Sequence, residues 1–402
     1  MDTMTEEITV STTTAENRKK LEQALPMWKI VLSQFMEHKM AVVGAIIICI
    51  FVTLALSAPL IEAVTGLDPD AQNVFNRYLP PMSHTIAGRD VRETTIEKFI
   101  TTKPEVAEAL QKSLIEKSLV TTTVPGDALY ELTAKEAKDA VQILQQVGTA
   151  ESLELQKTFK TFESYHLFGT DELGRDVFIR LIYGTRISMS VGVLVALVSA
   201  LVGLLIGSLA GFYGGAVDTL LMRVTDALIS LPLLPVMIVI AAIDMQKVPV
   251  LNSLVGAQNE SILKMIIILC LFSWMTVARL VRGSILSLRE REFILAARTL
   301  GATDVTIIIR HMFPNVIAPM LVSITLGVGE SILFEAALSF LGLGIQPPTP
   351  SWGNMLFNAQ ELIYQAPFLA IIPGVMILLT VISFNYLGDG LQDAMDPKAI
   401  RR

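Results

Sequence analysis

Residues 287–315, SLREREFILAARTLGATDVTIIIRHMFPN, form a polar stretch between two long apolar runs. Their pattern predicts two short helices separated at Gly301, because glycine readily takes the left-handed conformation that ends many helices. Ser287 and the glutamate three residues later predict a capping box at the start of the first helix. Thr303 predicts the start of the second helix, and Pro314 predicts its end. The stretch is therefore expected to be an ordered loop rather than a tether.

Each predicted helix of this stretch carries one apolar face. In the first helix the face has two alanines at its centre, which let the backbone of another protein approach closely. The arginines of the stretch place it on the cytoplasmic side of a membrane. We interpret the loop as a docking surface for another protein; the alternative, an amphipathic pair lying on lipid headgroups, is physically as reasonable. The faces comprise Phe293, Ala296, Ala297 and Leu300 in the first helix, and Val305, Ile308, Ile309 and Met312 in the second.

The composition of the chain is that of a membrane protein. Of its 402 residues 52% are hydrophobic and 17% charged, and the mean hydropathy is +0.56, which is too apolar for an ordinary soluble domain. The formal net charge of -7 does not indicate a nucleic-acid partner. The two cysteines lie in apolar runs, the four histidines lack ligand spacing, and no GxxxxGK[ST] loop occurs. We therefore predict no catalytic, cofactor or metal site here, and an ATPase that drove transport would be another chain.

Six apolar segments are long enough to cross a bilayer as helices. In the second, small residues recur every four positions from Ser199 to Gly211, a stripe that predicts close helix packing within the subunit. In the third, Pro232 and Pro235 predict a kink. Arginine-rich inner loops place both termini in the cytoplasm. The predicted spans are residues 40–64, 187–212, 220–243, 262–280, 316–343 and 368–386.

The segments outside the spans differ in character. Residues 1–17 are polar and aperiodic, which predicts a disordered tail, and residues 18–39 have the basic, amphipathic pattern of a cytoplasmic interfacial helix. An external loop follows the first span, and part of it has helical character. The remaining assignments are residues 65–165 for that external loop, 166–390 for a core with five spans and a cytoplasmic loop at 283–315, and 391–402 for a cytoplasmic tail.

The polar stretch resembles the cytoplasmic "EAA" loop of binding-protein-dependent ABC importer permeases, whose coupling helices fit a groove on the ATPase. Ala296, Ala297, Gly301 and Pro314 hold the positions of the family pattern. Leu295 stands where a glutamate is usual, so the spacing is kept but the acidic group is not.

Two external stretches resemble the C-type subunits of oligopeptide and dipeptide permeases. Residues 166–180, HLFGTDELGRDVFIR, are similar to the signature HxxGTDxLGRDxxxR, and residues 335–353 match the same family almost residue for residue. We expect the first stretch to form an interfacial helix with Asp171 near its start, or else a solvated loop. The prolines after Gln346 and the nearby Trp352 are expected to form a stiff loop with an aromatic at the interface. The resemblance leaves out residues 84–163, which look like an insertion.

The resemblance implies an all-α polytopic membrane protein with six transmembrane helices of the type I ABC importer permease fold and an inserted external helical subdomain. It implies a subunit of an ATP-driven peptide importer in the bacterial inner membrane, without an ATPase site of its own. Its partners would be a second permease subunit, two ATPase subunits that bind ATP, and an external peptide-binding protein. The loop at 291–312 would couple ATPase closure to the spans through Phe293, Ala296, Ala297, Leu300, Gly301 and Pro314.

Glu330 and Glu335 lie within the fifth predicted span, where carboxylates are costly and therefore candidates for function. Either could face a polar pathway and meet the ammonium group of a peptide. For each residue the alternative is a hydrogen bond between helices, which we favour.

Other functions fit parts of the pattern. Closely similar permeases serve nickel complexes and other small solutes. A secondary transporter would need coupling-ion groups and two matching halves. The sequence offers only the two glutamates as coupling-ion groups, and its halves do not match. An anchored sensing or adhesion module would make the insertion the functional part, and deletion of residues 88–163 would separate that reading from a permease.

Overall fold

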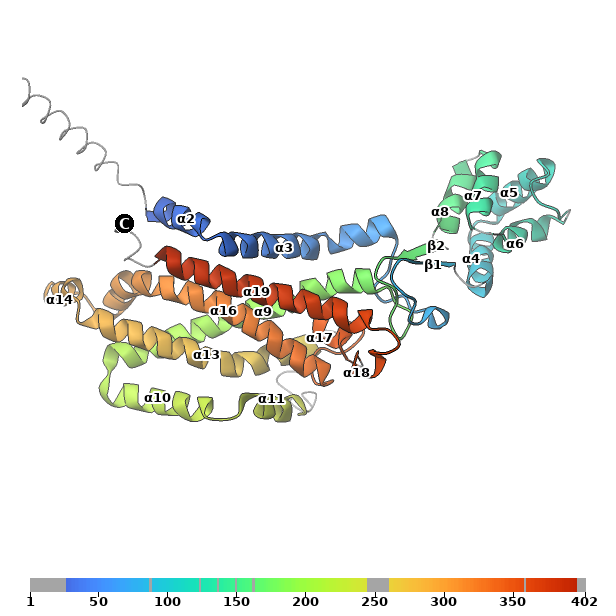
Figure 1. Cartoon of the computed structure of the whole chain (residues 1–402). Coiled ribbons are helices and arrows are strands. Elements are labelled where there is room, and N and C mark those ends of the chain that lie inside the picture. Colours follow the sequence, from blue (N-terminus) through green and yellow to red (C-terminus); the bar gives the residue numbers. More distant parts are fainter. Residues whose placement is uncertain are drawn as a thin grey trace, which may run out of the picture. The chain divides into compact units, whose positions relative to one another are not determined.

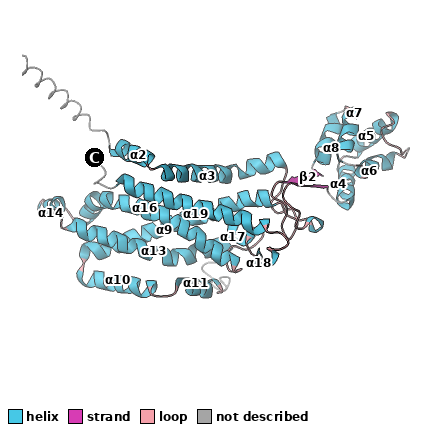
Figure 2. Ribbon diagram, in the orientation of Figure 1, coloured by secondary structure: helices cyan, strands magenta, loops and turns pink. Residues whose placement is uncertain are grey.

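The computed structural model describes residues 27–86, 89–122, 124–135, 137–148, 150–160, 163–243, 260–357 and 359–395. Helices dominate these residues (Figure 1), and Figure 2 shows the short strands β1 and β2 among them. Five of the described helices are long and apolar enough to cross a membrane, and six spans result if one sharply bent pair counts as a single span. The prediction of a six-span helical membrane protein is therefore confirmed.

The third span is broken rather than kinked. Its two helices meet at 83° around Ser230 and Pro232, where the proline lacks an amide hydrogen to continue the helix. The predictions for Asp244 onward to residue 259 lie outside the described residues. The long helices are α3 (Lys39–Thr65), α9 (Val177–Tyr213), α13 (Glu260–Arg289), α16 (Phe313–Phe340) and α19 (Phe368–Met395), and the bent pair is α10 (Gly215–Ile229) with α11 (Leu233–Ala241).

Several helices are longer than the sequence predicted. α9 begins ten residues before the predicted start at 187, and α19 runs through residues 391–395, which we had assigned to the tail. The interfacial helix predicted for 18–39 corresponds to α2 (Met27–Glu37), on which Leu32 and Met36 are exposed. The predicted tail at 1–17 and residues 396–402 lie outside the described residues.

The chain divides into two compact units, and the first consists of Met1–Thr53, Ile187–Gln346 and Val375–Arg402. Here the small-residue stripe of α9 packs against α13, as predicted. A Cβ added at Gly203 would lie 2.6 Å from the Cβ of Val277, and one at Gly207 would lie 2.5 Å from the carbonyl oxygen of Ala278. Because larger side chains would not fit, the glycines allow these two helices to approach closely.

The second unit comprises Leu54–Arg186 and Pro347–Gly374, and it contains the insertion. The helices of the insertion surround an apolar core centred on Leu114, Leu132, Leu144 and Phe159, none of which is more than 1% exposed. The insertion is therefore a helical subdomain with its own core. Its helices are α4 (Arg89–Thr102), α5 (Pro104–Glu116), α6 (Ala128–Thr133), α7 (Ala137–Val147) and α8 (Ala150–Lys160).

A carboxylate holds one turn of this subdomain. The backbone amides of Thr121 and Thr122 both donate to Glu131, at distances of 2.8 to 2.9 Å. Burial opposes ionisation of Glu131, but these hydrogen bonds and the nearby Lys135 outweigh it and hold its pKa below the ordinary value.

The ends of the insertion are paired. Strand β1 (Ser83–Ile86) runs antiparallel to β2 (Glu163–His166), with Ser83 opposite His166 and Ile86 opposite Glu163. The chain thus enters and leaves the insertion at one place.

Candidate functional site

The first helix of the predicted docking loop is α14 (Glu292–Thr299). The predicted capping box at Ser287 is wrong, because α13 continues through this residue to Arg289 and Arg291 precedes α14 instead. The prediction at Gly301 is confirmed. This residue has φ of +85°, its amide donates to the carbonyl of Arg298, and the next amide donates to Ala297, which is the Schellman arrangement.

The predicted apolar face of α14 is open. Leu300 is 88% exposed and Phe293 is 45% exposed, while Ala296 is exposed and Ala297 is half-buried. Large apolar side chains at such exposure favour contact with another molecule.

The opposite side of the loop is anchored to the spans. Ile294, Ile307 and Met312 are completely buried in one apolar cluster together with Ile285 of α13. The guanidinium carbon of Arg298 lies 5.7 Å from the ring centre of Phe212, the penultimate residue of α9. Ile294 was not part of the predicted face, because it lies between the apolar Phe293 and Leu295 and the sequence does not distinguish it from them. A force on α14 therefore reaches the spans through packed side chains.

The second loop helix begins as predicted and does not end as predicted. The Thr303 hydroxyl accepts the amide of Thr306 at the start of α15 (Asp304–Thr306), and a π-helix (Ile307–Met312) leads directly into α16. Pro314 lies in the first turn of α16, directly after the π-helix. Because the wider π turn does not need a hydrogen bond from the amide that proline lacks, Pro314 does not stop the helix. The predicted second face is divided: Val305 and Ile309 are exposed, whereas Met312 is buried.

The signature at 166–180 forms neither an interfacial helix nor a solvated loop. Residues 171–176 form a buried turn, and α9 starts after it with the Asp176 carboxylate accepting the amide of Ile179 at 2.9 Å. The Asp171 carboxylate accepts a hydrogen bond from Nε of Arg175 at 2.7 Å, and its Oδ2 lies 3.5 Å from Nε of Arg180. Each of these polar residues is at most 7% exposed. The charges are buried because they are paired, a relation that sequence periodicity does not reveal.

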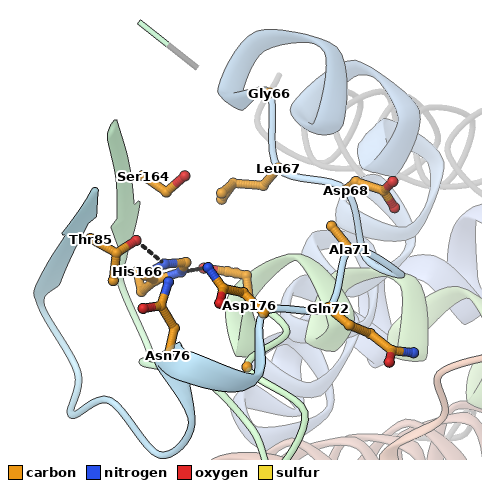
Figure 3. A pocket seen from close by; sticks show the side chains of 12 residues that line it. Gly66, Leu67, Asp68, Ala71, Gln72, Asn76, Thr85, Ser164, His166 and Asp176 are labelled. Carbon is orange, nitrogen blue, oxygen red and sulfur yellow. Dashed lines mark hydrogen bonds and ion pairs between the residues drawn. The ribbon is translucent and has the colours of Figure 1, made fainter. Parts of the chain in front are cut away.

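The same signature joins the insertion to the start of α9. Figure 3 shows His166 between Thr85 on β1 and Asp176, with contacts of 2.9 Å to the threonine hydroxyl and 2.6 Å to the carboxylate. A polar pocket of about 220 Å³ opens beside them, with Asn76 and Asp68 on its wall. Within this unit the signature therefore holds together, by hydrogen bonds, the two segments that flank the insertion.

The two glutamates of α16 differ in their surroundings. Glu335 is completely buried and accepts hydrogen bonds from Ser188 on α9 at 3.1 Å and from Ser339 at 2.8 Å. Its geometry matches the interhelical hydrogen bond that we favoured. Glu330 is exposed.

The prediction that Trp352 would lie at a membrane interface is wrong. Trp352 is completely buried, and a Cβ at Gly184 would lie 3.3 Å from its ring. It opens α17 (Trp352–Met355), which a capping box between Ser351 and Asn354 fixes. The ring thus packs inside the second unit instead of marking a membrane interface.

Two stretches of the chain match known family models. Residues 203–401 match the binding-protein-dependent transport system inner membrane component, and residues 26–81 match the N-terminal TM domain of oligopeptide transport permease C. The glutathione transport system permease protein GsiD of Escherichia coli O157:H7 is 45% identical over 233 residues, which cover 58% of this chain and 72% of that protein. The GsiD of Shigella sonnei strain Ss046 has the same identity and coverage, and that of Shigella dysenteriae serotype 1 is 44% identical.

The chain belongs to the family of binding-protein-dependent transport system inner membrane components. It is an ABC importer permease with the type I importer fold, as the sequence resemblance implied. In this permease two ion pairs join α13 to α10, at arginines whose sequence positions alone indicated only topology. Arg282 of α13 binds Asp218 of α10 through two contacts of 2.5 and 2.6 Å, and Arg279 binds Asp226 at 2.5 Å.

The permease departs from its family at the first position of the loop motif. Leu295 is 50% exposed beside the open face of α14. An apolar side chain is therefore available where related loops present a carboxylate.

Proposed function

We propose that this permease is one half of the translocation pathway of an ATP-driven, binding-protein-dependent importer of small peptides. Its relatives are named as glutathione transport permeases, and glutathione is itself a tripeptide, which supports peptide-sized cargo. The observation that carries the coupling part of the proposal is the two-sided loop: α14 is open on its apolar face and anchored on the other side.

The proposed partners follow from these two sides. Two ATP-binding subunits bind ATP, and one of them receives the face formed by Phe293, Ala296, Ala297 and Leu300. Gly301 ends the docking helix, and Pro314 lies where the loop passes into α16. A second permease subunit completes the pathway, and an external peptide-binding protein delivers the cargo.

The proposed topology places both termini and α14 in the cytoplasm of a bacterial cell, with this chain in the inner membrane. Arginines at 279, 282, 289, 291 and 298 gather at one end of α13 and in α14, which supports a cytoplasmic location for that end. The insertion would then lie outside the cell membrane.

The mechanism uses the anchored side of the loop. Closure of the ATPases on ATP moves α14, and the buried contacts of Ile294 and Met312 pass this motion to α13 and α16. The continuous helix from Asp304 to Phe340 carries it across the membrane. The spans thereby alternate between outward-open and inward-open arrangements.

The experiment is uptake of labelled glutathione and of labelled di- and tripeptides by cells carrying Gly301→Pro, with co-purification of the ATPase scored in parallel. Proline cannot adopt the φ of +85° at this position, so the end of α14 must rearrange. We expect both uptake and co-purification to be lost while the permease stays in the membrane. Retention of both would refute the coupling role of the loop.

Three controls separate the rival functions. Uptake that survives ATP depletion but stops when the proton gradient is dissipated would indicate a secondary transporter. Uptake of a nickel complex in place of peptides would assign a different cargo to the same machinery. Deletion of residues 88–163 should spare assembly, whereas an anchored external module would lose its function entirely.

A further inference from the structure

Helices α16 and α19 pack side by side in the first unit. A Cβ added at Gly329 of α16 would lie 3.7 Å from Oδ1 of Asn385 on α19, and one at Gly388 would lie 2.9 Å from the hydroxyl of Thr325. Glu330, next to Gly329, is therefore level with the stretch of α19 around Asn385. Both residues lie well inside helices of 28 residues, far from either helix end.

One face of this helix pair is open and the other is covered. On α16, Ile332 meets Gly192 of α9 and Glu335 meets Ser188. Glu330 lies about 140° to 160° around the helix from these two residues, given roughly 100° for each residue. It is thus on the side that faces away from α9.

The open face of α19 is polar as well. Asn385 and Asp389 are exposed one turn apart, whereas the neighbouring Phe384 is buried. Four residues correspond to a rise of about 6 Å, so Asn385 and Asp389 lie on the same side of the helix about 6 Å apart along its axis. Apolar side chains surround them, because Leu378 and Ile382 of the same helix are 56% and 38% exposed.

An exposed carboxylate within a membrane span, such as that of Glu330, is costly in lipid and needs water or a cation. Three described cations of this unit already have partners: Arg279 and Arg282 bind aspartates, and Lys264 donates to a backbone carbonyl. Among the described residues, no ion pair joins Glu330 or Asp389 to a basic side chain. The face is therefore suited to a cation that comes from outside the chain.

We infer that Glu330, Asn385 and Asp389 line the cargo pathway and bind the positive charge of a passing peptide, either its ammonium terminus or a lysine side chain. This inference rests on the proposed function. The carboxylate of Glu330 receives the cation within the membrane, the amide oxygen of Asn385 accepts a hydrogen bond from it, and Asp389 attracts it one turn further along α19.

The first experiment tests whether the face is wet, and it does not depend on transport. In a background of Cys49→Ser and Cys270→Ala, single cysteines replace Asn385 or Asp389 in the assembled importer in membrane vesicles. A charged, membrane-impermeant maleimide should label both. The matched control is Leu201→Cys on α9, which is 61% exposed among apolar neighbours and should stay unlabelled in lipid. Equal labelling of all three positions, or of none, would overturn the inference.

The second experiment tests recognition of charge. Proteoliposomes with the complete importer take up a tripeptide with a central lysine or one with a central glutamate. Glu330→Gln and Asp389→Asn should each lower the ratio of lysine-peptide to glutamate-peptide uptake about fivefold to tenfold. The matched control Glu361→Gln removes an exposed carboxylate outside the long helices and should leave the ratio unchanged.

The outcomes separate the two proposals. Because all vesicles contain the same binding protein, its own preference cancels when each variant is compared with the wild type. An unchanged ratio in both variants, with ATP-driven uptake intact, would overturn the charge recognition but leave the importer function standing. Absence of ATP-driven uptake in the wild type would overturn the proposed function, and the maleimide result would still decide whether the face is an aqueous path.

Discussion

Leu300→Asp is the sharpest perturbation of the proposed docking face. The side chain is 88% exposed in this chain, so its replacement removes almost no internal packing. Full burial of a leucine is worth about 1.5 to 3 kcal/mol, and 88% of that is about 1.3 to 2.6 kcal/mol. Since about 1.4 kcal/mol corresponds to a factor of ten, the affinity for the ATPase should fall roughly tenfold to seventyfold, and the buried carboxylate would add to this loss.

The assay is titration of the detergent-purified permease pair with labelled ATPase, alongside ATP-dependent uptake. The control is Leu153→Asp in the insertion, where a leucine is 57% exposed away from the docking loop. It should leave the affinity within about twofold of the wild type. An equally small effect of Leu300→Asp would refute the assignment of this face, because the residue would then stay in water in the complex.

Three further substitutions test the packing and the charges. Gly207→Ala should lower the unfolding temperature in detergent, because the added methyl would lie 2.5 Å from a carbonyl oxygen of α13; the control Gly283→Ala has open space and should gain up to about 1 kcal/mol of stability. Asp171→Ala should cost about 3 to 5 kcal/mol and reduce the amount of permease in the membrane, since two buried arginines lose their shared carboxylate, whereas the exposed Asp68→Ala should not. Because the pKa of Glu131 is lowered by folding, its stabilisation is complete above the unfolded value near 4.5 and is lost as the pH falls through the lower folded value. The hydrogen-exchange protection factors of the insertion, which are corrected for the slower intrinsic exchange in acid, should therefore fall on acidification below that pH, and Glu131→Gln should make them less dependent on pH.

The spans and the loop ends were predictable because their signals are local. Hydropathy over twenty residues identifies a membrane helix, and the left-handed glycine and the hydroxyl cap act on their own helix ends. Gly301 and Thr303 are therefore placed correctly. Pro314 was misjudged because its effect depends on the turn before it, and a π turn has no strong sequence pattern.

The external signature could not be interpreted from spacing. Asp171, Arg175 and Asp176 look like a solvated helix start in a linear sequence. Their ionic partners lie within ten residues, but the contacts that tie this turn into the fold reach distant segments: Arg180 donates to the carbonyl of Pro69, and His166 contacts Thr85 of β1. Burial of charge is decided by such partners. The same reason explains the error at Trp352, whose burial depends on a glycine of α9.

The candidate site was predicted in part. The open face of α14 follows from helical periodicity, whereas the anchoring contact of Ile294 with the spans requires the folded arrangement of α9 and α13. The difference between Glu330 and Glu335 likewise depends on which neighbour lies on each side of α16. Periodicity identifies the faces of a helix but not what covers them.

The paired strands at the base of the insertion make this part of the chain replaceable as a cassette. Ile86 and Glu163 lie opposite each other where the insertion begins and ends, so a two-residue turn could join β1 to β2 there without stretching the remaining chain. An affinity tag, a fluorescent protein or a rigid marker for electron microscopy could be grafted at the same two positions. Homologous importers that lack the subdomain could equally be given one, which would turn a peculiarity of this permease into a transferable handle.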